Sequence, residues 1–163
     1  MPDRLNTFRF PGESAVALFR LSHQHSSRGK FGRLFGRIIY RLNLMINGAD
    51  INPFATIGTG FRLYHSAGVV IGKVKIGDNV SIFQNVTIGS RYVQPPPDPV
   101  PDHEMPVIGD HVTIYAGAVI AGPCKIGSRA EIGANAVVLN DVPANCLAVG
   151  VPARIILRPP AEK

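Results

Sequence analysis

The sequence predicts an all-β solenoid preceded by a short α-helical segment. The first observation behind this prediction is an aliphatic residue that returns every six positions through most of the chain. The second is a proline-rich stretch that interrupts this period, and the third is an amphipathic helical pattern near the N-terminus. A period of six fits neither a helix nor a simple alternating strand, whereas hexapeptide repeats are typical of parallel β-helices.

The repeat is clearest in the C-terminal half of the chain. Six successive hexads carry an aliphatic residue without a slip, at Ile108, Ile114, Ile120, Ile126, Ile132 and Val138. Two earlier runs, 70–88 and 51–63, have the same spacing and are joined after a one-residue slip. We expect each hexad to form one short strand, with three strands per coil, the aliphatic residue inside and glycine in the tight turns.

The repeat is interrupted by residues 89–107, which include five prolines between positions 95 and 101. Proline cannot donate the hydrogen bonds of a β-ladder, so the segment is predicted to leave the solenoid as an extruded loop. Long loops in compact domains are often functional, and this one carries His103 between two acidic residues.

The N-terminal part of the chain is predicted to be helical over 14–46. One face of the second half is apolar, formed by Phe31, Leu34, Phe35, Ile38, Ile39, Leu42 and Met45. The other face is basic, formed by Lys30, Arg33, Arg37 and Arg41. Two interpretations remain open: a cap over the first coil, or a helix (28–46) lying in the plane of an anionic membrane surface. The cap is favoured because solenoid ends require capping.

These patterns divide the chain into three parts. Residues 1–48 form the helical N-terminal cap segment, residues 49–156 the solenoid, and residues 157–163 a C-terminal tail. A composition of 45% hydrophobic and 17% charged residues fits a folded chain rather than a disordered one. No stretch approaches the roughly 20 apolar residues of a membrane span.

The net charge of +6 lies mainly in the N-terminal third, where residues 1–50 hold eight basic and three acidic side chains. No nucleic-acid-binding motif accompanies this charge, so no nucleic-acid partner is expected. Cys124 and Cys146 provide neither a disulfide framework nor a zinc-binding spacing, so no metal is expected. The first residues lack the apolar core of a signal peptide, and we expect a cytoplasmic protein.

His65 is the strongest candidate for acid–base chemistry, because it lies at the slip in the repeat, where the solenoid wall is irregular. Asp50 precedes it by 15 residues, close to the length of one coil, so the two side chains could meet on neighbouring coils. Such a carboxylate would orient the imidazole and stabilise its protonated form. The pair suits removal of a proton from a hydroxyl that attacks an activated acyl group. The alternative is a purely structural histidine in a non-catalytic scaffold.

Two stretches, Tyr64–Gly72 and Val80–Gly89, resemble the hexapeptide acyltransferases of the serine acetyltransferase type. The closing segment Ala148–Ile155 is similar to the end of that family. The length of the chain and its short helical N-terminus look more like the colanic-acid and exopolysaccharide branch. The resemblance implies a left-handed parallel β-helix, a homotrimer with active sites between subunits, and acetyl-CoA as the donor.

The resemblance also implies roles for individual residues. His65 matches the catalytic histidine and Asp50 its carboxylate partner. Four further residues match positions that bind the cofactor: Gly89, Ala116 and Ala134 along the pantetheine channel, and Arg154 near the phosphates. A guanidinium group suits such an anion.

The acceptor site departs from the family. Tyr64 replaces the aspartate that holds the amino group of serine, and Asp102-His103 stands in place of the Arg-His pair of the loop. The sequence therefore predicts that Tyr64 and His103 contact a sugar hydroxyl acceptor, either a small molecule or a lipid-linked precursor. L-Serine is the alternative acceptor. A metal lyase of the γ-carbonic-anhydrase type, with His65, His103 and His111 around zinc, is a more distant alternative.

Overall fold

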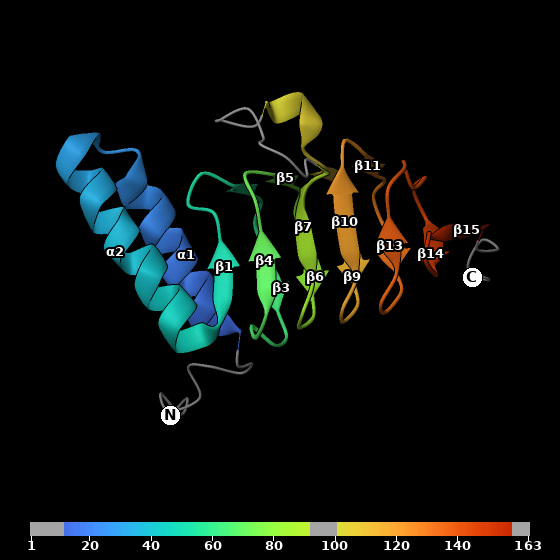
Figure 1. The fold of residues 1–163 in the computed structure, drawn as a ribbon, viewed down its shortest axis with the longest axis horizontal. Coiled ribbons are helices and arrows are strands. Elements are labelled where there is room, and N and C mark those ends of the chain that lie inside the picture. The colour runs from blue at the N-terminus through green and yellow to red at the C-terminus, as the bar shows by residue number, and fades with distance from the viewer. Residues whose placement is uncertain (1–11, 92–100, 158–163) are drawn as a thin grey trace, which may run out of the picture.

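The computed structural model describes residues 12–91 and 101–157. Two helices stand at one end of a stack of short strands, which runs from there to the C-terminal end (Figure 1). The helices are α1 (Glu13–Ser26) and α2 (Gly29–Asn47). A single turn of 3-10 helix, η1 (Asp102–Glu104), lies beside the stack.

The strands form three sheets, one for each side of the coil. The first sheet contains, in order, β1 (Ala49–Ile51), β4 (Val69–Ile71), β7 (Thr87–Ser90), β10 (Val119–Gly122) and β13 (Val137–Val138). The second contains β11 (Lys125–Ile126), β8 (Val107–Ile108), β5 (Lys75–Ile76) and β2 (Thr56–Ile57). The third contains β15 (Arg154–Leu157), β14 (Cys146–Val149), β12 (Glu131–Ile132), β9 (Thr113–Ile114), β6 (Ser81–Ile82) and β3 (Arg62–Leu63).

Neighbouring strands in each sheet come from successive coils and are parallel, except that β15 folds back antiparallel to β14. The aliphatic residues of the repeat are stacked in register, as where Ile82 lies opposite Ile114 and Ile114 opposite Ile132. These three side chains are fully buried and belong to one continuous core. The predicted left-handed parallel β-helix with an α-helical N-terminal segment is therefore confirmed.

The two helices cap the first coil. Ala15 and Phe19 of α1 are buried and join the core of the solenoid. Helix α2 packs on α1 through Asn43, whose side-chain amide donates to the carbonyl of Ala15 at 3.0 Å. Ser22 of α1 donates to the carbonyl of Gly36 at 2.8 Å, where a side chain larger than glycine would overlap α1. Both helices thus pack at the first coil, while contact of residues 28–46 with an anionic membrane surface stays a prediction.

The predicted apolar face of α2, however, does not pack on the solenoid. Of its seven residues only Ile39 is buried, while Phe31 and Met45 are 91% and 81% exposed. The helix instead turns a narrow side with Gly36 and Asn43 toward α1, because small and polar side chains there permit close approach and hydrogen bonding. Most of the apolar face is left open to solvent in the single chain.

The interruption of the repeat is shorter than the expected 89–107. Strand β7 continues through Gly89 and Ser90, which lie opposite Ala121 and Gly122 of β10, and β8 begins at Val107. The proline-rich residues 92–100 lie outside the described residues. In the part of the chain that the structure describes, no helix has the length and apolar character needed to cross a bilayer.

Candidate active site

The chain segments that carry Asp50 and His65 meet at one corner of the solenoid. Asp50 lies in β1 opposite Val70 of β4, and His65 lies in the turn that leads into β4. The backbone N–H of Gly68, three residues after His65, donates to the carbonyl of Gly48 at 3.0 Å. This bond holds the histidine turn beside the start of β1.

Asp50 is held by a residue of the cap. The hydroxyl of Tyr40, in α2, donates to Asp50 Oδ1 at 2.6 Å. Burial, together with the hydrogen bond to Asp50 and the charge of that carboxylate, raises the pKa of Tyr40 to about 12. The phenol is therefore protonated at neutral pH and acts as the hydrogen-bond donor to Asp50.

His65 is exposed, and no hydrogen bond between its imidazole and Asp50 is recorded among the described residues. The predicted pairing of the two side chains therefore stays a prediction, although their backbone segments are adjacent. An exposed imidazole is accessible to an acceptor bound at the surface of the chain. It can serve as a general base only if the acceptor hydroxyl reaches hydrogen-bond distance of the ring.

Three aromatic rings form a row beside the histidine turn. Tyr64 stacks on Phe83 with ring centroids 4.7 Å apart, and Phe83 stacks on Tyr115 at 5.4 Å. The rings come from three successive coils, each directly after a buried aliphatic residue of the third sheet. Only Tyr64 was predicted from the sequence to contact a ligand, but the recurrence of aromatic residues at this place of the hexad could have revealed the row.

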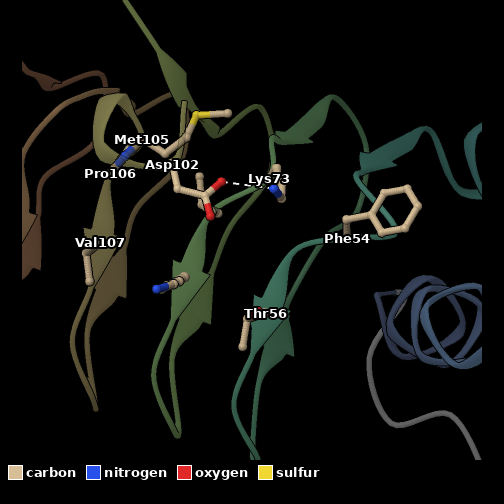
Figure 2. A pocket seen from close by; sticks show the side chains of 9 residues that line it. Phe54, Thr56, Lys73, Asp102, Met105, Pro106 and Val107 are labelled. Atoms are coloured by element: carbon tan, nitrogen blue, oxygen red, sulfur yellow. Dashed lines mark hydrogen bonds and ion pairs between the residues drawn. The ribbon is translucent and has the colours of Figure 1, made fainter. Parts of the chain in front are cut away.

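His103 lies elsewhere, on η1. Its Nε2 is 3.5 Å from Glu104 Oε1, and its side chain is 78% exposed. The neighbouring Asp102 accepts a hydrogen bond from Lys73 Nζ at 2.9 Å, and this bond lowers the pKa of the Asp102 carboxyl group (Figure 2). Lys73 and Asp102 line a hollow of about 70 Å³, which has room for a few water molecules and not for a substrate. The described contacts do not bring His103 to His65.

The four residues expected to bind the cofactor are spread over the solenoid. Ala116 and Ala134 lie at turns of neighbouring coils, where the N–H of Asn135 donates to the Ala116 carbonyl at 2.9 Å. Gly89 lies in β7, and a methyl group added there would meet no atom within 4 Å. Arg154 is exposed at the start of β15. Their roles in binding the cofactor stay predictions.

The three histidines of the metal-lyase alternative are not brought together. His111 lies in a turn with a positive φ of 57°, and its N–H donates to the carbonyl of Asp78 at 2.8 Å. No group of three or more histidine, cysteine, aspartate or glutamate side chains is placed to hold a metal ion within 12–91 and 101–157.

Tyr40 is the residue of this corner that was not predicted from the sequence. It lies ten positions before Asp50 in the chain, within the amphipathic stretch whose pattern indicates a cap or a surface helix. No spacing rule links a helical tyrosine to a strand carboxylate in this way, since their contact depends on how α2 crosses the first coil (Figure 1).

Comparisons with known proteins give one consistent result. The family model described as bacterial transferase hexapeptide (six repeats) matches residues 105–140. A serine acetyltransferase of Mycobacterium tuberculosis is 41% identical over 150 residues, which cover 91% of this chain and 62% of the relative. A serine acetyltransferase of Helicobacter pylori is 37% identical over 151 residues, which cover 91% of this chain and 83% of the relative.

Solved structures agree with these relatives. The soybean serine acetyltransferase apoenzyme superposes with a TM-score of 0.81 at 38% identity, covering 90% of this chain and 58% of that one. A structure described as serine acetyltransferase in complex with CoA has a TM-score of 0.78 at 34% identity, covering 90% and 57%. The chain thus spans less than two thirds of the length of several proteins that it matches. These relatives carry the name serine acetyltransferase rather than that of the exopolysaccharide enzymes.

Proposed function

Because this chain belongs to the hexapeptide-repeat serine acetyltransferase family, we propose that it transfers the acetyl group of acetyl-CoA to a hydroxyl group of an acceptor. The observation that carries this proposal is the corner formed by the histidine turn and β1, where an exposed His65 lies beside the segment of Asp50. The choice of donor is supported by the related serine acetyltransferase whose structure is a complex with CoA.

In the proposed reaction His65 accepts the proton of the acceptor hydroxyl while the oxygen attacks the thioester carbonyl of acetyl-CoA. The tetrahedral intermediate then collapses to an acetyl ester, and the C–S bond to CoA breaks. The imidazolium returns the proton to the departing sulfur, so that CoA leaves as a thiol. Asp50 would orient the imidazole and stabilise its charge, while Tyr40 holds Asp50 in place at 2.6 Å.

The donor is proposed to lie along the small residues of the solenoid surface. Gly89, Ala116 and Ala134 present little side-chain volume, which would let the pantetheine arm approach the backbone. Arg154 is exposed and would contact the phosphates of the donor through charge-assisted hydrogen bonds. A homotrimer, in which a second subunit covers this surface, is part of the proposal, as is a cytoplasmic location with access to acetyl-CoA.

L-Serine is the acceptor that the relatives support. The relatives from M. tuberculosis and H. pylori carry the name serine acetyltransferase, and one related structure, the soybean enzyme, is described as complexed with serine. On this proposal the hydroxyl of L-serine becomes the acetyl ester.

A sugar hydroxyl is the second candidate acceptor, favoured by the aromatic row. Tyr64 occupies the position next to His65 and stacks on Phe83. Aromatic rings pack well against the apolar face of a sugar ring, and Tyr64 lacks the carboxylate that would pair with the ammonium group of serine. His103 would contact such an acceptor only if the η1 segment of another subunit, or a movement of this one, brings it near. On this second candidate, the protein would be an acetyltransferase of the colanic-acid type, and its acceptor would be a free or lipid-linked sugar.

Replacement of His65 tests the reaction. We expect His65→Ala to lose acetyl transfer by about two to four orders of magnitude, the usual contribution of a general base. Binding of acetyl-CoA and the oligomeric mass should stay unchanged, because His65 is exposed and outside the core. CoA release is measured with a thiol reagent, and binding by calorimetry. Near-normal turnover in the variant would remove His65 from its proposed role.

A panel of acceptors separates the two candidates. Acetyl-CoA consumption is measured with L-serine, free sugars and nucleotide-linked sugars under identical conditions. Rapid turnover with L-serine alone would exclude the sugar candidate, and turnover with a sugar alone would exclude serine. The Tyr64→Asp variant sharpens the comparison, since it restores the family's acidic residue and should raise kcat/KM for L-serine only.

A further inference from the structure

A second hollow lies between the cap and the first coil, away from the residues expected to bind the donor. It has a volume of about 630 Å³, within the range of small-molecule sites. Its walls come from the end of α1, from α2 and from the segment that follows β1. The lining residues are Ser26, Lys30, Arg33, Leu34, Arg37, Tyr40, Asn52, Pro53 and Phe54.

The charge of this hollow has one sign. Lys30, Arg33 and Arg37 lie three and four positions apart, so that they share one side of α2. No carboxylate is found among the lining residues, and no ion pair of these three cations is recorded in the described ranges. Like charges at these spacings destabilise a helix, and an anion between them would relieve the repulsion.

The remaining lining supplies an apolar wall and a polar group. Phe54 is 54% exposed, so part of its ring is accessible to a ligand. The side-chain oxygen of Asn52 accepts the N–H of Phe54 at 2.9 Å, so the amide nitrogen is not used in this bond and is available as a donor. Two guanidinium groups, one ammonium and one amide donor next to an aromatic ring match an organic molecule that carries phosphate.

We propose that this hollow is a binding site for the phosphate or diphosphate group of an organic molecule, with Arg33, Arg37 and Lys30 as its anion ligands. Arginine pairs with phosphate oxygens through two parallel hydrogen bonds, and lysine adds a point charge. The organic part of the ligand packs against Phe54 and Leu34.

The position of the hollow ties it to the proposed reaction. Tyr40 lines the hollow and also donates to Asp50 Oδ1. A ligand in the hollow therefore lies one side chain away from the carboxylate proposed to orient His65. The bound phosphate is then the anchor of the acceptor, as in a nucleotide-linked sugar. This last step rests on the sugar candidate of the proposed function, whereas the binding of the anion does not.

Binding of inorganic pyrophosphate to the full chain tests the site directly. Isothermal titration calorimetry at low ionic strength compares the wild type with the double variant Arg33→Gln/Arg37→Gln. We expect saturable binding by the wild type and affinity about tenfold or more weaker in the double variant, because each arginine contributes charge-assisted hydrogen bonds. Circular dichroism checks that the variant is folded, as expected for two exposed side chains.

The control is Arg41→Gln, which removes one charge from an exposed position of α2 outside the hollow and is compared with the single variant Arg37→Gln. Its affinity for pyrophosphate should equal that of the wild type. Absence of binding by the wild type, or an equal loss in Arg41→Gln, would overturn the proposal. Binding to vesicles with anionic lipid but not to pyrophosphate would also overturn it, and would assign the three cations to a membrane surface.

Two further arms separate this inference from the proposed function. His65→Ala should bind pyrophosphate like the wild type even though it transfers no acetyl group. In the transfer assay, pyrophosphate should compete with the acceptor, and this inhibition should weaken in the double variant. Binding without competition would overturn the assignment of the phosphate to the acceptor.

Discussion

Tyr40 shows how a residue outside the solenoid can hold the side chain of a residue within it in place. Its hydroxyl is the recorded hydrogen-bond partner of Asp50, at 2.6 Å. A carboxylate with a fixed donor has one oriented oxygen and one oxygen left for another partner, such as an imidazole N–H. The cap and the proposed catalytic corner are thereby connected through a side-chain hydrogen bond.

Replacement of Tyr40 by phenylalanine should lower kcat without changing the KM for acetyl-CoA. The loss should be about tenfold, since one hydrogen bond to a charged group is removed and the ring is kept. The proposed positioning role also predicts that Tyr40→Phe has little further effect in an Asp50→Asn background. Equal losses in both backgrounds, measured by steady-state kinetics, would mean that Tyr40 acts without Asp50.

The pH dependence of stability provides an independent check on Tyr40. Its pKa is raised to about 12, so the hydrogen bond contributes stability fully below the ordinary phenol value near 10 and loses it as pH rises through about 12. The difference in Tm between the wild type and Tyr40→Phe should be constant from about pH 6 to 9 and should shrink above about pH 10. A difference that persists beyond the raised pKa would argue against the bond.

The strands of the solenoid were predicted well from the sequence, because each hexad contains an aliphatic residue whose spacing marks it as buried. Ile114, Ile120 and Ile132 were expected inside and are fully buried. The face of α2 was predicted less well, because amphipathicity identifies which residues are apolar but not which neighbour they meet. Gly36 and Asn43 decide that packing, and their role depends on the position of α1. For the same reason Tyr40 could not be found from spacing.

At the scale of the coil, the turns are held by a polar ladder. Asp110 Oδ1 accepts the N–H of Asp78 at 2.8 Å, and the N–H of Asp110 donates to Ser128 at 3.1 Å. The glycines before these residues leave the space for this ladder, and a Cβ at Gly77 would overlap Asp110 and approach the backbone of Gly109. The recurring glycine of the hexad is therefore required by close contact between coils.

Two glycine substitutions separate fold from function at this scale. Gly77→Ala should destabilise the chain by about 1–3 kcal/mol, the usual cost of inserting a methyl group where there is no room. Gly89→Ala should leave Tm unchanged, because nothing lies within 4 Å of the added methyl. If the pantetheine arm lies along Gly89, the KM of this variant for acetyl-CoA should rise about tenfold. Thermal unfolding and kinetics of both variants check this, and an unchanged KM would remove Gly89 from the donor site.

For the molecule as a whole, one side of α2 is an apolar surface that is exposed to solvent in the single chain. Its apolar residues are Phe31, Leu34, Phe35, Ile38, Leu42, Met45 and Ile46, each at least 42% exposed. A contiguous apolar surface of this kind on a helix commonly marks an interface. We predict that the part of this surface outside the hollow contacts other copies of the chain, as in the proposed homotrimer.

Light scattering after size exclusion tests this assignment. The wild type should have three times the chain mass of 17.5 kDa. The oligomer of the variant Phe31→Ser/Met45→Ser should be weaker, so that it comes apart at protein concentrations at which the wild type is still assembled. Each side chain buried at an interface contributes about 1.5–3 kcal/mol. An unchanged mass, together with loss of binding to anionic vesicles, would assign this side of α2 to a membrane instead.

The reversal of β15 has a consequence for how many coils the solenoid can contain. A parallel stack grows by adding strands in one direction, and an open last coil would offer its edge to the first coil of another molecule. Here the final strand runs opposite to its neighbour, with Arg154 paired to Val149, while α1 and α2 occupy the other end. In the third sheet the reversed β15 therefore occupies the edge at which a further parallel coil would pair, which opposes head-to-tail addition of another molecule there.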